Sequence, residues 1–335
     1  MSKKIYIGIL LSVVISGLVL FAYSASLNKN IILHILNSVS FYEFIIAISL
    51  TILSFVIDGI KYFIVFKVLG QKISPIAAIN SCFITGYFSA VTPFSIGGQP
   101  FQILYLNKKG VKSSYATQVV FLRLFEMIFL MFLIDLTYIF AFSKNVAGIS
   151  KNLISLGLIL TFLTSLIILL SIIFPKLISK IVLLTSKIPL INRFLQAEKI
   201  ESWFHELDEV IKKIFREHKF LLFLDLIMMF FLLMFQSYVF FYALNIFAPL
   251  RIKFIEFFAT VNIVNAVAFL VPTPGASGSF EFVFTNALAP FAAEKELIIK
   301  GVLFFRFLSY YLVIIIGTLI LFLNLLKPQK TSPKK

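Results

Sequence analysis

Two arginines stand inside long apolar stretches of this sequence, where a charged side chain is costly and usually has a role. Arg123 follows the segment Thr92-Pro93-Phe94-Ser95-Ile96-Gly97, and Arg306 follows Thr273-Pro274-Gly275-Ala276-Ser277-Gly278 at a similar spacing. Both segments read Thr-Pro-x-x-x-Gly. Arginine binds phosphate through two parallel hydrogen bonds, so the chemistry that this pattern indicates is the binding of a phosphate anion.

Both motifs interrupt stretches that are otherwise typical of membrane helices. Proline removes a backbone donor and clashes with the preceding turn, and glycine tolerates backbone angles that other residues avoid, so a helix has to break at either motif. Within a membrane an open backbone persists only when it is buried in protein or lines a wet cavity. Interrupted segments at matching places in two halves of a chain therefore predict a binding site.

The half-helices that follow the motifs support the same prediction. Helix N-termini offer unpaired N–H groups and the positive end of the helix dipole, so two of them meeting at the bilayer midplane favour an anion. The predicted substrate-binding residues are Arg123, Arg306, Glu126, Glu281, Gly97, Gly98, Gln99, Gly275, Gly278, Ser279 and Tyr310.

Structural roles remain open for several of these residues. Arg123 and Glu126 are one helical turn apart and could neutralise each other. Arg306 has no acidic neighbour at helical spacing, so a structural partner would have to be Glu281, reached across the fold. Glu281 could instead contact an amine of a headgroup or carry a coupling proton. The glycines would serve close helix packing.

Other polar residues in the apolar stretches are expected to be structural. Asp58 and Lys61 are one turn apart, and Lys61 is near enough to the cytoplasmic end to extend its amine to the surface. Asp135 lies toward the outer end of its span and is expected to be wet. The single cysteine, Cys82, cannot form an intrachain disulfide. No paired-carboxylate, His/Cys or metal-ligand motif occurs, so we predict no catalytic site, metal or cofactor.

The composition places the chain in a membrane. Hydrophobic residues make up 60% of the 335 residues and charged residues 13%, and phenylalanine occurs 41 times. These values exclude an ordinary soluble domain and fit a polytopic membrane protein. The formal net charge of +15 comes mainly from lysines and arginines between the apolar stretches, where they set orientation, so no nucleic-acid partner is predicted.

The predicted fold is all-α, with about six full spans and two re-entrant broken-helix hairpins. The first apolar run, Ile5 to Phe21, ends in small residues that resemble a signal-peptidase site, but its length favours a retained helix. The predicted spans are Ile5 to Phe21, Phe44 to Phe66, Ser114 to Phe142, Leu153 to Phe174, Phe220 to Phe247 and Leu297 to Leu326, and the interrupted segments are Ile76 to Leu106 and Phe254 to Phe291.

The distribution of basic residues favours re-entrant hairpins over single crossings. If both interrupted segments return to the side from which they enter, most lysines and arginines lie on the same side of the membrane as the N- and C-termini, which is then the cytoplasmic side. The two halves are then inverted repeats, an arrangement typical of secondary transporters. The predicted domains are an N-terminal helix and outer loop (1–43), a first repeat (44–142), a connecting span and cytoplasmic segment (143–219), and a second repeat with a basic tail (220–335).

The sizeable polar segment before the second repeat contains an apolar stripe at helical spacing. Its members are Trp203, Phe204, Leu207, Val210, Ile211, Ile214 and Phe215. Asp208 with Lys212 and Glu209 with Lys213 form ion pairs on the opposite side. This pattern predicts an amphipathic helix lying on the membrane face or against the bundle.

Several of these residues together resemble the lysylphosphatidylglycerol synthase transmembrane family. The resemblance rests on Pro93-x3-Gly97-Gly98-x-Pro100, Lys108-Lys109-Gly110, Arg123-x-x-Glu126, Pro272-x-Pro274-Gly275-x-x-Gly278-x-x-Glu281 and Arg306-x3-Tyr310-Tyr311, and it covers nearly the whole chain. It implies a flippase-like polytopic fold with two re-entrant hairpins. In the best-known members it implies movement of aminoacylated phosphatidylglycerol between leaflets.

The sequence departs from that family in two places. Ala276-Ser277 stands where a Gly-x pair is usual. The chain also stops shortly after its last predicted span, so we expect it to lack the soluble aminoacyl-transfer domain and to be a stand-alone member.

The expected function is therefore a lipid translocase of the cell membrane, and not an enzyme. Its partner would be a lipid with a phosphate headgroup, either a phospholipid or a polyprenyl phosphate. Two alternatives stay open: a membrane subunit or anchor for a separate glycosyltransferase or lipid synthase, and an intramembrane lipid-modifying enzyme.

Overall fold

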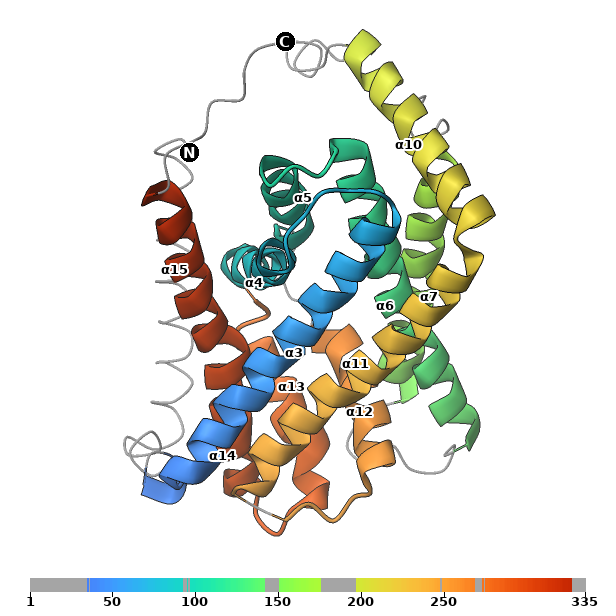
Figure 1. The fold of residues 1–335 in the computed structure, drawn as a ribbon. Helices are drawn as coiled ribbons and strands as arrows, with labels where there is room; N and C mark the ends of the chain where they lie inside the picture. Colours follow the sequence, from blue (N-terminus) through green and yellow to red (C-terminus); the bar gives the residue numbers. More distant parts are fainter. Residues whose placement is uncertain are drawn as a thin grey trace.

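The computed structural model of this chain describes residues 35, 37–92, 95, 97–141, 151–175, 197–247, 249–268, 273 and 275–326. Every regular element in these ranges is helical (Figure 1). The elements are α3 (Phe41–Val68), α4 (Pro75–Val91), α5 (Gly98–Lys108), α6 (Ser113–Ala141), α7 (Lys151–Ile173), α10 (Ala197–Glu217), α11 (Lys219–Asn245), α12 (Phe254–Ala268), α13 (Ser279–Leu288), η1 (Ala289–Phe291), α14 (Lys295–Arg306), η2 (Phe307–Tyr311) and α15 (Leu312–Leu326).

Four of the described helices are long and apolar enough to cross a membrane. They run over Phe41–Val68, Ser155–Ile173, Lys219–Asn245 and, through α14, η2 and α15 together, Lys295–Asn324. Many large apolar side chains on these helices are exposed, among them Ile167 on α7 and Phe322 on α15. Such a surface suits lipid rather than water. The predicted span Ile5 to Phe21 lies outside the described residues.

The first interrupted segment starts and finishes at the same end of the molecule. Ser74 caps α4 by accepting a hydrogen bond from the Ala77 backbone N–H, and α5 ends at Lys108. The backbone N–H of Lys112, just after α5, then donates to Oε1 of Gln71, just before α4, at 3.1 Å. α4 and α5 therefore form a helical hairpin with both ends together.

The second interrupted segment behaves in the same way. The backbone N–H of Arg251, before α12, donates to the carbonyl oxygen of Phe291, after α13, at 2.7 Å. Figure 1 shows the α4–α5 hairpin toward the upper end of the molecule and α12 and α13 toward the lower end. The long helices α3 and α11 run between these ends and pack against each other.

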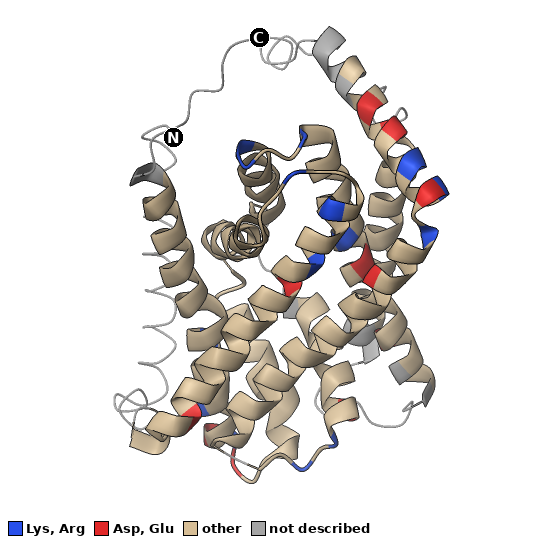
Figure 2. Ribbon diagram, in the orientation of Figure 1, with Lys and Arg blue, Asp and Glu red and all other residues tan. Residues whose placement is uncertain are grey.

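Basic side chains gather at the end that carries α4 and α5. Figure 2 shows lysines and arginines on the turns that flank this hairpin and on α10, and fewer at the lower end, where the α11–α12 loop carries Arg251 and Lys253. The middle of the molecule holds a small group of charges within otherwise apolar helices (Figure 2).

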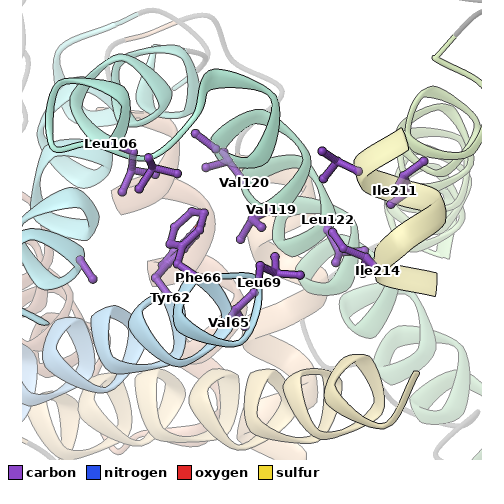
Figure 3. Packing of buried hydrophobic residues seen from close by; sticks show 14 of the residues in the cluster. Tyr62, Val65, Phe66, Leu69, Leu106, Val119, Val120, Leu122, Ile211 and Ile214 are labelled. Carbon is purple, nitrogen blue, oxygen red and sulfur yellow. The ribbon is translucent and has the colours of Figure 1, made fainter. Parts of the chain in front are cut away.

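The amphipathic helix α10 packs against the bundle. Ile211 and Ile214 are buried beside Leu122 of α6 (Figure 3), and Nε2 of Gln118 on α6 donates to the carbonyl oxygen of Leu207 at 2.9 Å. Burying each isoleucine side chain contributes about 1.5–3 kcal/mol. Of the two alternatives for this helix, packing against the bundle is the one observed.

The details of α10 match the sequence pattern in part. The predicted Asp208–Lys212 ion pair is present at 2.8 Å. Glu209 instead approaches His205, at 3.4 Å, and Phe215 is exposed rather than part of the buried stripe. The side chain of Trp203 lies outside the described part of the structure.

Candidate functional site

The two Thr-Pro motifs adopt the same backbone turn. The N–H of Ser95 donates to the carbonyl oxygen of Thr92 at 3.2 Å, and the N–H of Ala276 donates to that of Thr273 at 3.1 Å. Ser95 and Ala276 have φ angles of 56° and 55°, and they are the non-glycine residues in the described chain with positive φ. Since that conformation is strained for such residues, its recurrence at matching positions marks both breaks as constrained structures.

The ends of the two interrupted helices meet. The hydroxyl of Tyr310, in η2, donates to the carbonyl oxygen of Ala90, at the end of α4, at 3.1 Å. Gly275 fits against the same pair, because an added Cβ would lie 2.3 Å from the Tyr310 ring and 3.3 Å from the Ala90 oxygen. Only a residue without a side chain allows this contact between the second break and α4.

Arg306 is held beside the second break by a buried carboxylate. Its Nε donates to Oε1 of Glu281 at 2.7 Å, and its Nη2 donates to Oγ of Ser277 at 3.0 Å. The rings of Tyr310 and Phe280 lie 4.4 and 5.0 Å from the guanidinium carbon. Glu281 was offered above as the structural partner of Arg306, and the structure contains that pair.

Glu281 also closes the N-terminus of α13. Its Oε2 accepts a hydrogen bond from the backbone N–H of Gly278 at 2.7 Å. This helix end therefore already holds an anionic group, in the position that the helix dipole favours. The carboxylate bridges the helix end and the guanidinium, which are the two features that the sequence predicts for anion binding.

Arg123 lies in a second site of the same kind. Its Nη2 pairs with the carboxylate of Asp58 on α3, its Nη1 donates to the Asp58 carbonyl oxygen at 3.3 Å, and the Tyr62 ring lies 3.9 Å from the guanidinium carbon. Sequence analysis offered Glu126 as the structural partner, but Asp58 occupies that place, because the Arg123 side chain reaches across to α3 instead of along its own helix.

The other buried charges differ from the expectations. The amine of Lys61 is buried and lies 3.3 Å from Oδ1 of Asp225 on α11, so it does not extend to the surface. Asp225 was missed by sequence reasoning, although it is the lone acidic residue between Lys219 and Asn245. Asp135 is buried rather than wet, and its Oδ1 has no hydrogen-bond partner among the described residues.

The remaining predicted site residues line the breaks. The N–H of Gly97 donates to Oγ1 of Thr92 at 2.9 Å, and Gly98 packs so tightly on α4 that an added Cβ would lie 2.2 Å from Oγ of Ser89. Close packing thus explains Gly98. The half-buried Gln99 lies in the first turn of α5, whose N-terminus has no side-chain cap. Ser279 donates to the Ala276 carbonyl oxygen at 2.9 Å.

The two arginines thus occupy separate sites, each with its own carboxylate and aromatic ring. A guanidinium paired with a carboxylate can bind a phosphate when that partner is exchanged, since both anions use the same donors. Among the described residues, no group of three or more His, Cys, Asp or Glu side chains could hold a metal ion.

Fold and site together define a polytopic helical membrane protein with two arginine–carboxylate pairs inside its helix bundle, one of them beside a helix break. The model of the family described as "Lysylphosphatidylglycerol synthase TM region" matches residues 7–317, and the chain belongs to that family. This match confirms the family resemblance drawn from the sequence motifs. No curated protein matches the chain significantly.

Proposed function

We propose that this protein is a lipid translocase that moves an anionic or lipid-linked phosphate headgroup across the bilayer. The observation that carries the proposal is the contact of the second break, at Gly275, with Tyr310 and with Ala90 at the end of α4, with Arg306 beside it. The family to which the chain belongs takes its description from the transmembrane region of a lipid synthase, and this supports a lipid substrate. The midplane of the bilayer is where broken helices in transporters bind their substrates.

In the proposed mechanism a headgroup phosphate takes the place of Glu281 on Arg306. The guanidinium always needs a counter-charge, because an unpaired buried charge is strongly destabilising. Glu281 keeps its other hydrogen bond, to the Gly278 N–H, while the phosphate occupies the vacated donors. The aromatic rings of Tyr310 and Phe280 hold the guanidinium plane during this exchange.

The two hairpins supply the alternating access that translocation needs. Both return to the end from which they start, and they lie toward opposite ends of the molecule. We propose that they are re-entrant hairpins of inverted repeats, which open the central contact to one leaflet at a time. The concentration of basic residues beside α4 and α5 supports a cytoplasmic position for that end under the positive-inside rule (Figure 2).

Exchange of fluorescent lipids between leaflets of liposomes tests this function. Liposomes with the reconstituted protein are compared with protein-free liposomes, using phosphatidylglycerol and a polyprenyl phosphate as anionic lipids and phosphatidylcholine as the zwitterionic control. Faster exchange of an anionic lipid supports the proposal. Equal acceleration of all lipids would contradict headgroup recognition, and no acceleration of either anionic lipid would favour a subunit or anchor of a separate lipid synthase.

A further inference from the structure

Five charged side chains lie together between α3, α6 and α11, and all but Asp58 are buried. They are Asp58 and Lys61 from α3, Arg123 and Glu126 from α6, and Asp225 from α11. Charges within membrane helices usually have a functional role. The proposed headgroup exchange uses Arg123 at most, and it assigns no role to the rest of this group.

The charges in this cluster do not balance. Arg123 is paired with Asp58, and Lys61 is paired with Asp225 at 3.3 Å, which leaves Glu126 without a cation of its own. Glu126 is 3% exposed, and its Oε2 has no hydrogen-bond partner in the part of the chain that the structure describes. Three acids and two bases, all ionised, would leave one uncompensated negative charge in a region of low dielectric, where it costs several kcal/mol, on the order of the penalty for a single buried ion.

The surplus charge falls on Glu126. This residue lies on α6 one helical turn from Arg123, whose guanidinium reaches across to Asp58 on α3. An ionised carboxylate can only accept hydrogen bonds, whereas a protonated carboxyl group can also donate one. One proton on Glu126 brings the cluster to two positive and two negative charges.

We propose that Glu126 is a proton-binding site, in which its buried carboxyl group carries one exchangeable proton. This site is distinct from the breaks, and its proton leaves the cluster with the balanced Arg123–Asp58 and Lys61–Asp225 pairs. It goes beyond the proposed function, because it does not depend on which lipid is bound.

The elements around the cluster bring few other charges close to it. The Asp58 side chain is 25% exposed, so the cluster is not fully enclosed. Tyr62 of α3 and Cys82 of α4 are the other titratable groups near Arg123. α7 and α12 also pack on α6, but their only charged residues, Lys151 and Glu256, stand in their first turns. On α10, Lys212 pairs with Asp208 and His205 with Glu209, and the other charged side chains described there are exposed.

Infrared spectroscopy tests the site without any transport measurement, through the carbonyl stretch of protonated carboxyl groups. Asp135 is a second buried carboxyl on α6, so all proteins carry Asp135→Asn as a common background. At neutral pH we expect one protonated carboxyl in this background protein. Adding Glu126→Gln should remove its band completely.

Asp225→Asn distinguishes a proton that Glu126 holds because of the charge balance of the cluster from one that it holds because of burial alone. Without Asp225 the cluster has two acids and two bases, so Glu126 should ionise and the same band should disappear. Persistence of the band in Asp225→Asn would show that burial alone protonates Glu126, and would overturn the proposal. Its persistence in Glu126→Gln would do the same. If either isosteric variant fails to fold, a pH titration of the background protein decides: the absence of a protonated carboxyl at neutral pH rejects the site.

Discussion

Each buried arginine in the described chain pairs with one carboxylate from another helix and lies over at least one aromatic ring. Arg306 and Glu281 are almost completely enclosed, whereas Asp58, the partner of Arg123, keeps part of its side chain exposed. Because breaking an enclosed pair leaves a charge with no water to replace its partner, the Arg306 site has the larger energetic consequence. The resting carboxylate keeps Arg306 compensated whenever no headgroup is bound.

Removing the charge of Glu281 should therefore destabilise the fold. Glu281→Gln leaves the Arg306 guanidinium buried without a counter-charge, so we expect a loss of about 3–5 kcal/mol in the free energy of unfolding. Adding Arg306→Gln should recover part of this loss, because the uncompensated charge is then gone. Denaturation of the purified variants in detergent measures both effects. Equal stability of Glu281→Gln and wild type would contradict the pairing.

Gly275 provides a second residue-scale test. In Gly275→Ala the new methyl group would collide with the Tyr310 ring, so we expect destabilisation of about 1–3 kcal/mol from overpacking, in addition to the cost of the positive φ. Gly70→Ala is the matched control, since Gly70 has φ of 71° but nothing within 4 Å of an added Cβ. Thermal unfolding should separate the two variants. Equal losses of stability in the two variants would mean that the contact between Gly275 and Tyr310 does not contribute to stability.

At the scale of elements, the two interrupted helices share a turn but end differently. Both have the strained residue three positions after threonine. The helix after the first break begins without a side-chain cap, whereas the helix after the second carries its own carboxylate. The Arg306 helix continues into a π-turn over Phe307–Tyr311, which carries Tyr310 toward the first break. Single π-turns within helices are frequent at functional sites.

The hairpins give a direct prediction for membrane topology. In a Cys82→Ala background, Gln71→Cys and Lys112→Cys should react with a membrane-impermeant thiol reagent from the same side, because the Lys112 N–H bonds to Gln71. Arg251→Cys should react from the other side. Labelling of Gln71→Cys and Lys112→Cys from opposite sides would mean that this segment crosses the bilayer, and would overturn the re-entrant arrangement.

Sequence reasoning located the elements well, because their signals are local. Proline and glycine at Thr92–Gly97 and Thr273–Gly278 mark the breaks, and uninterrupted apolar runs mark the long helices. The Arg306–Glu281 pair was also within reach, since no acidic residue stands at helical spacing from Arg306. Helical periodicity identified the buried face of α10, except at Phe215.

The pairings of Arg123 and Lys61 could not be predicted in the same way. Asp58 and Asp225 lie on other helices, far from their partners in sequence, and helical spacing shows only neighbours on one helix. Spacing therefore favoured Glu126 for Arg123 and surface exposure for Lys61. Which helices face each other is decided by packing, which one sequence does not reveal. The positive φ of Ser95 and Ala276 has no sequence signal either, because glycine usually occupies such positions.

For the molecule as a whole, the central contact and the buried charge cluster lie on different helices of one bundle. Hydrogen bonds link the cluster to the first hairpin. Tyr62, which stacks on Arg123, donates to Oε1 of Gln102 on α5 at 3.4 Å, and Nε2 of Gln102 donates to Oγ of Ser81 on α4 at 3.3 Å. Arg123, one helical turn from Glu126, is thus connected through Tyr62 to the hairpin that forms one side of the breaks.

This link predicts that lipid exchange depends on a proton gradient. With equal pH on both sides and then with a pH difference across the liposome membrane, the wild-type initial rate of anionic lipid exchange should change several-fold. In Glu126→Gln the two rates should be equal, because the site no longer binds a proton. Asp135→Asn, on the same helix but outside the cluster, should respond as the wild type does. A Glu126→Gln protein that keeps the wild-type response would contradict proton coupling.

The most direct test of the account compares two arginine variants in the leaflet-exchange assay. Arg306→Gln removes the guanidinium beside the breaks, and Arg251→Gln removes an exposed arginine from the α11–α12 loop. With folding verified for both, the account predicts that Arg306→Gln loses the acceleration of anionic lipid exchange and that Arg251→Gln retains it. Wild-type exchange in Arg306→Gln would show that lipid moves without the guanidinium, and would contradict the central claim.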